Sequence, residues 1–225
     1  MCAVEPIGYW TPGSATLFYR IAEAARIRSE NRPVIGEPLH NALTALVFAH
    51  ATIEAHVNET FALASLFAER NELLSRFAAV DEEIFDFLNV GIKYQLARIM
   101  MTGVSYDRGQ KPFSELIFLV SLRNDLLHPK PLKKKVGVLP DGTVEEKHDK
   151  LIDGLVSRGL YTPPTLPEPV PKQVGGWRDC LKSPETEQWA CKTAYEMTES
   201  LLQVVPKPFD QLLGSIKDGQ SVSGA

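Results

Sequence analysis

The residues best suited to chemistry lie in one short segment, RNDLLH, at residues 123–128. Histidine is the side chain best suited to accept or donate a proton near neutral pH, which makes His128 a candidate for acid–base chemistry. The guanidinium of Arg123 presents a planar set of donors that matches the oxygens of a phosphoryl group as charge builds on them. Asn124 can orient either the imidazole or a phosphate. These residue types favour acid–base chemistry at a phosphate ester.

Arg123 stands at an unusual place in the helix that carries it. Residues 112–128 have the apolar period of a helix, and Pro129 predicts an end at or near His128. Arg123 takes a position midway along the apolar stripe, where another core residue is expected. Because burying an unpaired charge is costly, we expect Arg123 to pair internally or to face a polar cleft or a subunit interface. The stripe comprises Leu116, Leu119, Val120, Leu126 and Leu127.

A second, polar face of the same helix carries Ser121, Asn124, Asp125 and His128. Arg123 and His128 are separated by about 140° around the helix axis, so they are not neighbours on one face. Their joint action requires the reach of the long arginine side chain, or a second copy of the helix packed about a two-fold axis.

The basic residues of the chain are concentrated around this segment. The whole chain has 24 lysines and arginines against 28 acidic residues, a net charge of −4, which does not favour a surface coated in nucleic acid. Between positions 123 and 135, however, there are five cations and one anion. Any polyanion should therefore meet this local patch, although a solvated loop is the alternative interpretation. Its lysines are Lys130, Lys133, Lys134 and Lys135.

The elements that must position these residues are helical. Apolar residues recur at helical spacing over residues 14–28, 39–67, 81–101, 112–128 and 184–205. The helix over 39–67 is apolar nearly all round, so it should be central, and its polar residues need partners. Those polar residues are His50, Glu54, His56 and Asn58.

The patterns predict an all-α fold: one bundle of about five helices over residues 1–215. A Pro-rich, largely irregular insertion is expected at 129–183, before the last helix, with a short helix near 147–157 and a short hairpin near 136–144. The tail at 216–225 is small and polar, and we expect it to be frayed.

Composition narrows the classes of protein. The 225 residues are 44% hydrophobic, and no apolar run is long enough to span a membrane. The N-terminal segment lacks a secretory pattern, so we expect a soluble, cytoplasmic protein. Its three cysteines have neither disulfide nor zinc spacing. His50 and Glu54 form half of a possible metal site, but no matching second pair is visible, so no metal or other cofactor is expected.

The R-N-x-x-x-H string, placed at the end of a proline-terminated helix, resembles the signature of the HEPN superfamily of all-α domains. The resemblance extends to IEAHVNE at residues 53–59 and QWA at 188–190, and it covers roughly residues 39–128 and 184–205. It implies an HEPN-like bundle that acts as a homodimer.

The resemblance also implies an activity: metal-independent cleavage of RNA of the toxin or defence type, with an antitoxin protein as a possible partner. The ribose 2′-OH would attack the adjacent phosphate in a cleft shared by two protomers. Arg123, Asn124 and His128 would be catalytic. Position alone, rather than the resemblance, suggests that Glu54 and Asp125 support them and that the lysines guide the RNA.

Other interpretations remain open at this stage. Arg123 can be a structural arginine paired with Glu54, and His128 alone can simply cap its helix. The chain can then be a non-catalytic helical dimer that binds RNA, a nucleotide or a partner protein through the same cleft. It can also be an interaction domain unconnected with RNA.

Overall fold

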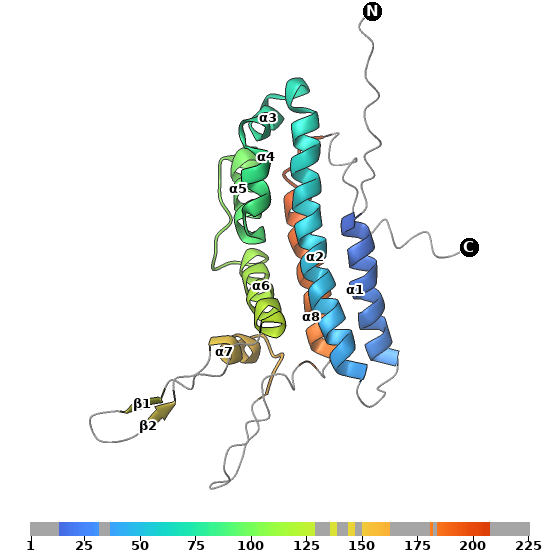
Figure 1. Ribbon diagram of the computed structural model, residues 1–225, viewed down its shortest axis with the longest axis vertical. Helices are drawn as coiled ribbons and strands as arrows, with labels where there is room; N and C mark the ends of the chain where they lie inside the picture. The colour runs from blue at the N-terminus through green and yellow to red at the C-terminus, as the bar shows by residue number, and fades with distance from the viewer. Residues whose placement is uncertain are drawn as a thin grey trace, which may run out of the picture.

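The computed structural model describes residues 14–31, 37–128, 136–138, 144–146, 150–162, 181 and 184–207. The described part is an all-α bundle with eight α-helices, and the only strands in it form a two-stranded hairpin (Figure 1). The predicted all-α class is therefore confirmed, while the HEPN-like detail stays a prediction. Among the described residues, no helix combines the length and the apolar character that crossing a membrane requires.

The long helix α2 (Glu37–Leu66) is the centre of the bundle. It packs against α1 (Ser14–Asn31) and α8 (Pro184–Leu202), and these two helices also contact each other. Its opposite side contacts α5 (Val90–Thr102) and α6 (Phe113–Leu127), which Figure 1 shows one after the other along α2. Small side chains let the helices approach closely. Those with no exposed surface include Ala22, Ala25, Ala42, Ala45 and Ala49.

Five helices have 13 or more residues: α1, α2, α5, α6 and α8. Four of them correspond to predicted helices, and α5 covers only the second part of the helix predicted over 81–101. The short turns that follow α2 were not predicted, namely η1 (Ala68–Arg70), α3 (Glu72–Ser75) and η2 (Phe77–Ala79). Asn71 begins α3 by accepting hydrogen bonds from the backbone N–H groups of Leu73 and Leu74. A helix of one turn that begins at a polar cap is too short to produce a periodic apolar pattern, so apolar spacing could not predict it.

The single helix predicted over 81–101 is wrong. The structure has two helices there, α4 (Glu82–Phe87) and α5, with an extended residue, Leu88, between them. The break occurs because Asn89 caps α5, its side chain accepting a hydrogen bond from the N–H of Ile92 at 3.0 Å.

The break also changes which side chains of this region are buried. Phe87 is 91% exposed, and Ile84, Ile92 and Ile99, which also fit the apolar period of one helix over 81–101, are exposed too. The core instead receives a different set: Phe85, Val90, Tyr94, Ala97 and Met101.

The helix α6 begins after Pro112 and ends at Leu127, with His128 as its C-cap, as predicted. Its buried stripe differs from the predicted one. Leu116, Leu119 and Leu122 have no exposed surface, whereas Leu127 is exposed. The fully buried part of α6 therefore ends at Leu122, the residue directly before Arg123.

The described parts of the insertion contain both elements that were predicted within it, a short hairpin and a short helix. The hairpin pairs β1 (Val136–Val138) with β2 (Val144–Glu146) in antiparallel register, so its second strand continues past the predicted limit. The helix α7 (Lys150–Ser157) begins three residues later than predicted and packs on α6 through buried Leu151 and Leu155. The expected tail at 216–225 and most of the Pro-rich stretch lie outside the described residues.

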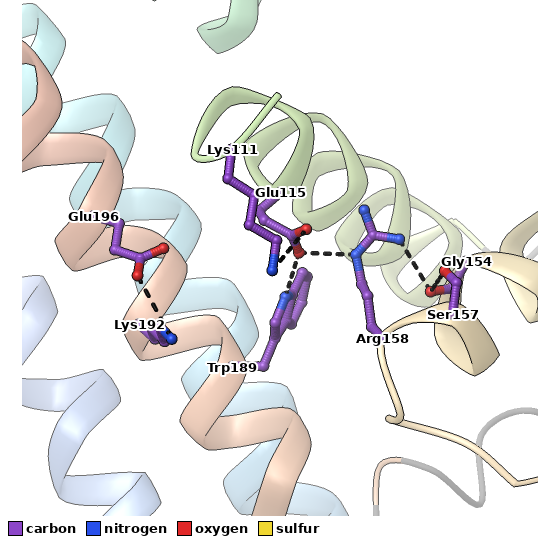
Figure 2. A network of polar contacts seen from close by, with 8 residues as sticks. All are labelled: Lys111, Glu115, Gly154, Ser157, Arg158, Trp189, Lys192 and Glu196. Atoms are coloured by element: carbon purple, nitrogen blue, oxygen red, sulfur yellow. Dashed lines mark hydrogen bonds and ion pairs between the residues drawn. The ribbon is translucent and has the colours of Figure 1, made fainter. Parts of the chain in front are cut away.

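A polar cluster attaches α7 to the bundle (Figure 2). Glu115 of α6 is buried, and its Oε2 accepts hydrogen bonds from Arg158 Nε at 2.8 Å and from Trp189 Nε1 of α8 at 2.6 Å. The Arg158 guanidinium also lies 4.0 Å from the centre of the Phe118 ring. Three helices that are distant in the sequence thus meet at one carboxylate.

Candidate functional site

The candidate site is the C-terminal end of α6. His128 leaves helical geometry with φ −127° and ψ 65°, and its backbone N–H still donates to the Asn124 carbonyl at 2.9 Å. Its side chain is exposed, as are those of Asn124 and Ser121. Three of the four residues predicted for the polar face are therefore open to solvent together, and the fourth, Asp125, is half-buried.

Arg123 is half-buried, and its side chain turns toward the polar face. Its Nη1 donates a hydrogen bond to the Asn124 Oδ1 at 2.9 Å, while its Nε is buried without a hydrogen-bond partner in the described part of the chain. The reach of the arginine side chain thus brings part of its charge beside a residue that is one turn from His128. The guanidinium keeps donors that no neighbour uses.

The predicted partner of Arg123 is not in contact with it. No ion pair joins Glu54 to Arg123 within the residues that the structure describes; the Glu54 Oε2 instead lies 3.8 Å from the His50 Nδ1 on the preceding turn of α2. The predicted pairing of Arg123 with Glu54 is therefore not observed among the described residues.

His50 of α2 is close enough to Arg123 for their charges to interact. It is buried, and burial lowers its pKa; the Glu54 carboxylate opposes this shift and the charge of Arg123 adds to it. The side of α2 that faces Arg123 therefore carries a neutral imidazole at neutral pH rather than a second cation. A signal was available in the sequence, because His50 is a polar residue in a helix that is otherwise apolar.

The other polar residues of α2 have found partners away from the site. Lys93 Nζ of α5 donates to Asn58 Oδ1 at 3.0 Å, and the Tyr94 hydroxyl lies 3.4 Å from His56 Nδ1. His56 is buried, and burial lowers its pKa to about 4, so it is neutral. These contacts join α2 to α5, and they belong to the core.

The remaining candidate residues are not tested by the geometry. Lys130, Lys133, Lys134 and Lys135 lie outside the described residues. Across the part that is described, no three His, Cys, Asp or Glu side chains gather as a metal site would require. Cys191 is the one cysteine in that part, and it is buried with a free thiol.

Comparison with known proteins gives no relative from which a role could be transferred: no protein-family model, curated protein or solved structure matches the chain.

Proposed function

We propose that the chain is a metal-independent endoribonuclease whose active site is completed when two copies bring their α6 ends together. The observation that carries the proposal is the 2.9 Å hydrogen bond from Arg123 Nη1 to Asn124 Oδ1, which directs a half-buried cation toward the exposed face that also carries His128. The resemblance of the R-N-x-x-x-H string to HEPN domains agrees with this reading but is not required by it.

The proposed reaction needs only groups that this site offers. One His128 imidazole takes the proton of a ribose 2′-OH, whose oxygen attacks the adjacent phosphorus. The bond from phosphorus to the 5′-oxygen breaks, and the His128 of a second copy, in its protonated form, gives that oxygen a proton. The products are a 2′,3′-cyclic phosphate and a 5′-hydroxyl, so no water or metal enters the step.

The free donors of Arg123 have a role in the same step. Charge builds on the non-bridging oxygens as the phosphorus becomes five-coordinate, and a guanidinium can donate two parallel hydrogen bonds to them. Asn124 keeps the guanidinium turned toward this position. Because burial keeps His50 neutral, it does not compete with Arg123 for the phosphate.

The test is incubation of the purified protein with RNA in EDTA. The parent should cleave RNA to ends that carry a cyclic phosphate, and His128→Ala and Arg123→Ala should each lower the rate by about 10²- to 10⁴-fold. His40→Ala and Arg108→Ala are matched controls, since both residues are exposed and lie outside the proposed site. A parent that remains inert, or controls that lose as much activity as the site variants, would contradict the proposal.

The second candidate is a helical dimer that binds RNA or a partner protein without cutting it. It is favoured by exposed apolar side chains on the same helix, Ile117 and Leu127, which suit a contact between proteins. A parent that binds RNA in a gel-shift assay with no cleavage would favour this candidate, and sedimentation velocity would report whether the binding species is a dimer.

A further inference from the structure

A cavity of about 420 Å³ lies at the other end of α6, away from the candidate site. It is formed by the loop between α5 and α6 together with the end of α8, and Pro112, the residue before α6, is part of its wall. Since α6 rises about 1.5 Å per residue, Pro112 and His128 are about 24 Å apart along the helix axis. The cavity is therefore separate from the proposed site of RNA cleavage, and its size suits a small molecule.

The wall of the cavity is held firmly by the loop residue Tyr106. Its backbone N–H donates to Gln95 Oε1 at 2.7 Å, and its carbonyl accepts from Gln95 Nε2 at 2.9 Å. Its ring stacks on Phe113 with 5.3 Å between ring centres, and its hydroxyl lies 3.0 Å from Ser200 Oγ of α8. A wall tied to three helices in this way keeps the cavity open without a ligand to order it.

Arg98 contributes a cation to this wall, and one of its hydrogen-bond donors has no partner in the described part of the chain. Its guanidinium carbon lies 4.4 Å from the centre of the Tyr106 ring, and its Nε is buried with no hydrogen-bond partner in the described part of the chain. No ion pair to a carboxylate is observed for it among those residues. By contrast, Arg26 and Arg158 are each bound to a glutamate. Arg98 also hydrogen-bonds the Tyr106 side chain, but a half-buried arginine with an unpaired donor and no carboxylate partner beside a cavity is still suited to an anion.

The remaining charges around the cavity favour the same sign of ligand. Lys111 adds a second cation, and Asp107 is the one acidic residue of the lining. The Asp107 carboxylate is partly satisfied by the loop itself, because its Oδ1 accepts from the N–H of Gly109 at 2.8 Å. Lys111 also forms an ion pair with Glu115, since its Nζ lies 3.8 Å from the Glu115 Oε1. Because the Lys111 side chain is 73% exposed, it can turn toward the cavity instead.

The two helix ends at the cavity do not cancel this preference. The N-terminus of α6, which carries the positive end of the helix dipole, begins directly after Pro112. The C-terminus of α8 has the opposite sign, but its last carbonyls accept hydrogen bonds from the turn that follows, as in the 3.0 Å bond from Gln203 N to the Glu199 carbonyl. The first N–H groups of α6 are used within the loop in the same way, as in the 2.9 Å bond from Ser114 N to the Gln110 carbonyl. The side-chain cations therefore set the local charge.

We propose that this cavity binds a small sugar phosphate. Arg98, Lys111 and the Ser105 hydroxyl would hold the phosphoryl oxygens, and the Gln110 and Gln203 amides would meet sugar hydroxyls. A nucleobase is a poorer fit, because the one aromatic ring of the lining, Tyr106, already packs against Phe113 and Arg98. The cavity is also larger than a lone phosphate needs.

Isothermal titration of the full chain with ribose 5-phosphate tests the proposal, with inorganic phosphate and unphosphorylated ribose as comparison ligands. Ribose 5-phosphate should bind at least about tenfold more tightly than either comparison ligand, because it alone uses both halves of the site. The Arg98→Gln variant should weaken binding by about tenfold or more, and Lys111→Gln by a smaller factor. Arg108→Ala, a matched loss of an arginine from the loop between α5 and α6 but outside the lining, should bind as the parent does.

Because Arg98 packs on Tyr106, its replacement can disturb the loop, so Ser105→Ala provides a second variant at an exposed position and should also weaken binding. His128→Ala should leave binding unchanged, which separates this proposal from the fate of the nuclease. The proposal is overturned if ribose 5-phosphate does not bind at about 10 mM, where ligands of this size normally register. Equal weakening by Arg108→Ala, or equal affinity for unphosphorylated ribose, would overturn it as well.

Discussion

Each half of α6 carries a charged side chain that is at least partly buried, and the two charges differ in how completely they are hydrogen-bonded. Near its start, Glu115 is 5% exposed and is contacted by Arg158, Trp189 and Lys111 (Figure 2). Near its end, half-buried Arg123 has one hydrogen bond, to the adjacent Asn124, and an Nε atom with no partner in the described part of the chain. The same helix thus carries one saturated charge and one that retains binding capacity.

The electrostatics of Glu115 agree with a structural role. Burial alone would raise its pKa, but the hydrogen bonds from Trp189 and Arg158 and the positive charges of Arg158 and Lys111 outweigh it, so the pKa is lowered. A carboxylate held ionised by neighbours that are themselves satisfied has nothing left to offer a ligand. The comparison indicates that a buried charge by itself does not identify a functional residue in this helix. A charged group whose hydrogen-bond donors lack partners is the better indicator.

Replacement of Glu115 should have the largest effect on stability. Glu115→Ala leaves the Arg158 guanidinium and the Trp189 N–H buried without their acceptor, so we expect the free energy of unfolding to fall by about 3–5 kcal/mol. Urea denaturation followed by circular dichroism measures it. Glu196→Ala is the matched control, because Glu196 pairs with Lys192 at 3.6 Å on the surface of α8 and should cost less than about 1 kcal/mol. Equal losses in the two variants would contradict the contrast drawn above.

The packing of α7 around the same cluster gives a smaller effect. A Cβ atom on Gly154 would lie 2.2 Å from the Phe118 ring, which is itself packed at its edge against Trp189. We expect Gly154→Ala to lower the free energy of unfolding by about 1–3 kcal/mol through overpacking, although alanine is the better helix former. Adding Phe118→Leu should cost less in the Gly154→Ala background than in the parent. Additive losses would show that the two side chains do not compete for space.

Glu187 of α8 is a second buried group whose charge is not satisfied. Neither carboxylate oxygen has a hydrogen bond of good geometry in the described part of the chain. Burial, reinforced by the negative charge of Glu30, raises the Glu187 pKa to about 7, although the nearby Ser29 hydroxyl and the positive charge of Arg26 act to lower it. Unlike Arg123, this group can lose its charge by binding a proton.

The raised pKa of Glu187 makes a prediction about pH. The folded state binds more protons than the unfolded state above the ordinary carboxyl pKa, so this group's contribution to stability is full below about pH 4.5 and is lost as pH rises through about 7. Glu187→Gln should remove that loss and raise the thermal midpoint relative to the parent at pH 8 more than at pH 5. Glu196→Gln is the surface control, and a pH-independent difference between Glu187→Gln and the parent would contradict the assignment.

The smallest effect on stability should come from the residue most important to the proposed activity. Arg123→Leu removes an incompletely satisfied cation and restores an apolar side chain to the stripe, so the free energy of unfolding should change by less than about 1 kcal/mol in either direction. Urea denaturation of this variant, compared with Glu115→Ala, measures the contrast within one helix. A loss of more than about 2 kcal/mol would make Arg123 a structural residue.

Much of the architecture could be predicted because apolar spacing and helix-breaking residues act locally. The period of 3.6 placed the long helices, and Pro129 placed the end of α6 at His128. The prediction for residues 81–101 was wrong for a local reason too. The Asn89 cap divides the region into two helices, and the buried side chains follow these two helices instead of one continuous stripe. Position 123 was recognisable because a cation interrupted an apolar series.

The partners of the charged side chains could not be predicted from the sequence, because they depend on which helices pack together. Glu54 and Arg123 looked complementary in sequence, yet Glu54 lies beside His50. Glu115 gave no signal on its own, since the groups that saturate it come 43 and 74 residues later in the chain.

The amino-acid sequence by itself determined that this protein is a helical bundle and that one helix ends in an arginine, an asparagine and a histidine, because periodicity, capping and proline geometry are properties of neighbouring residues. Only the tertiary structure decided which buried charges are satisfied and which keep free donors. The hydrogen bonds to Glu115 depend on atoms that helix packing brings within about 3 Å, and no spacing along the chain encodes that distance.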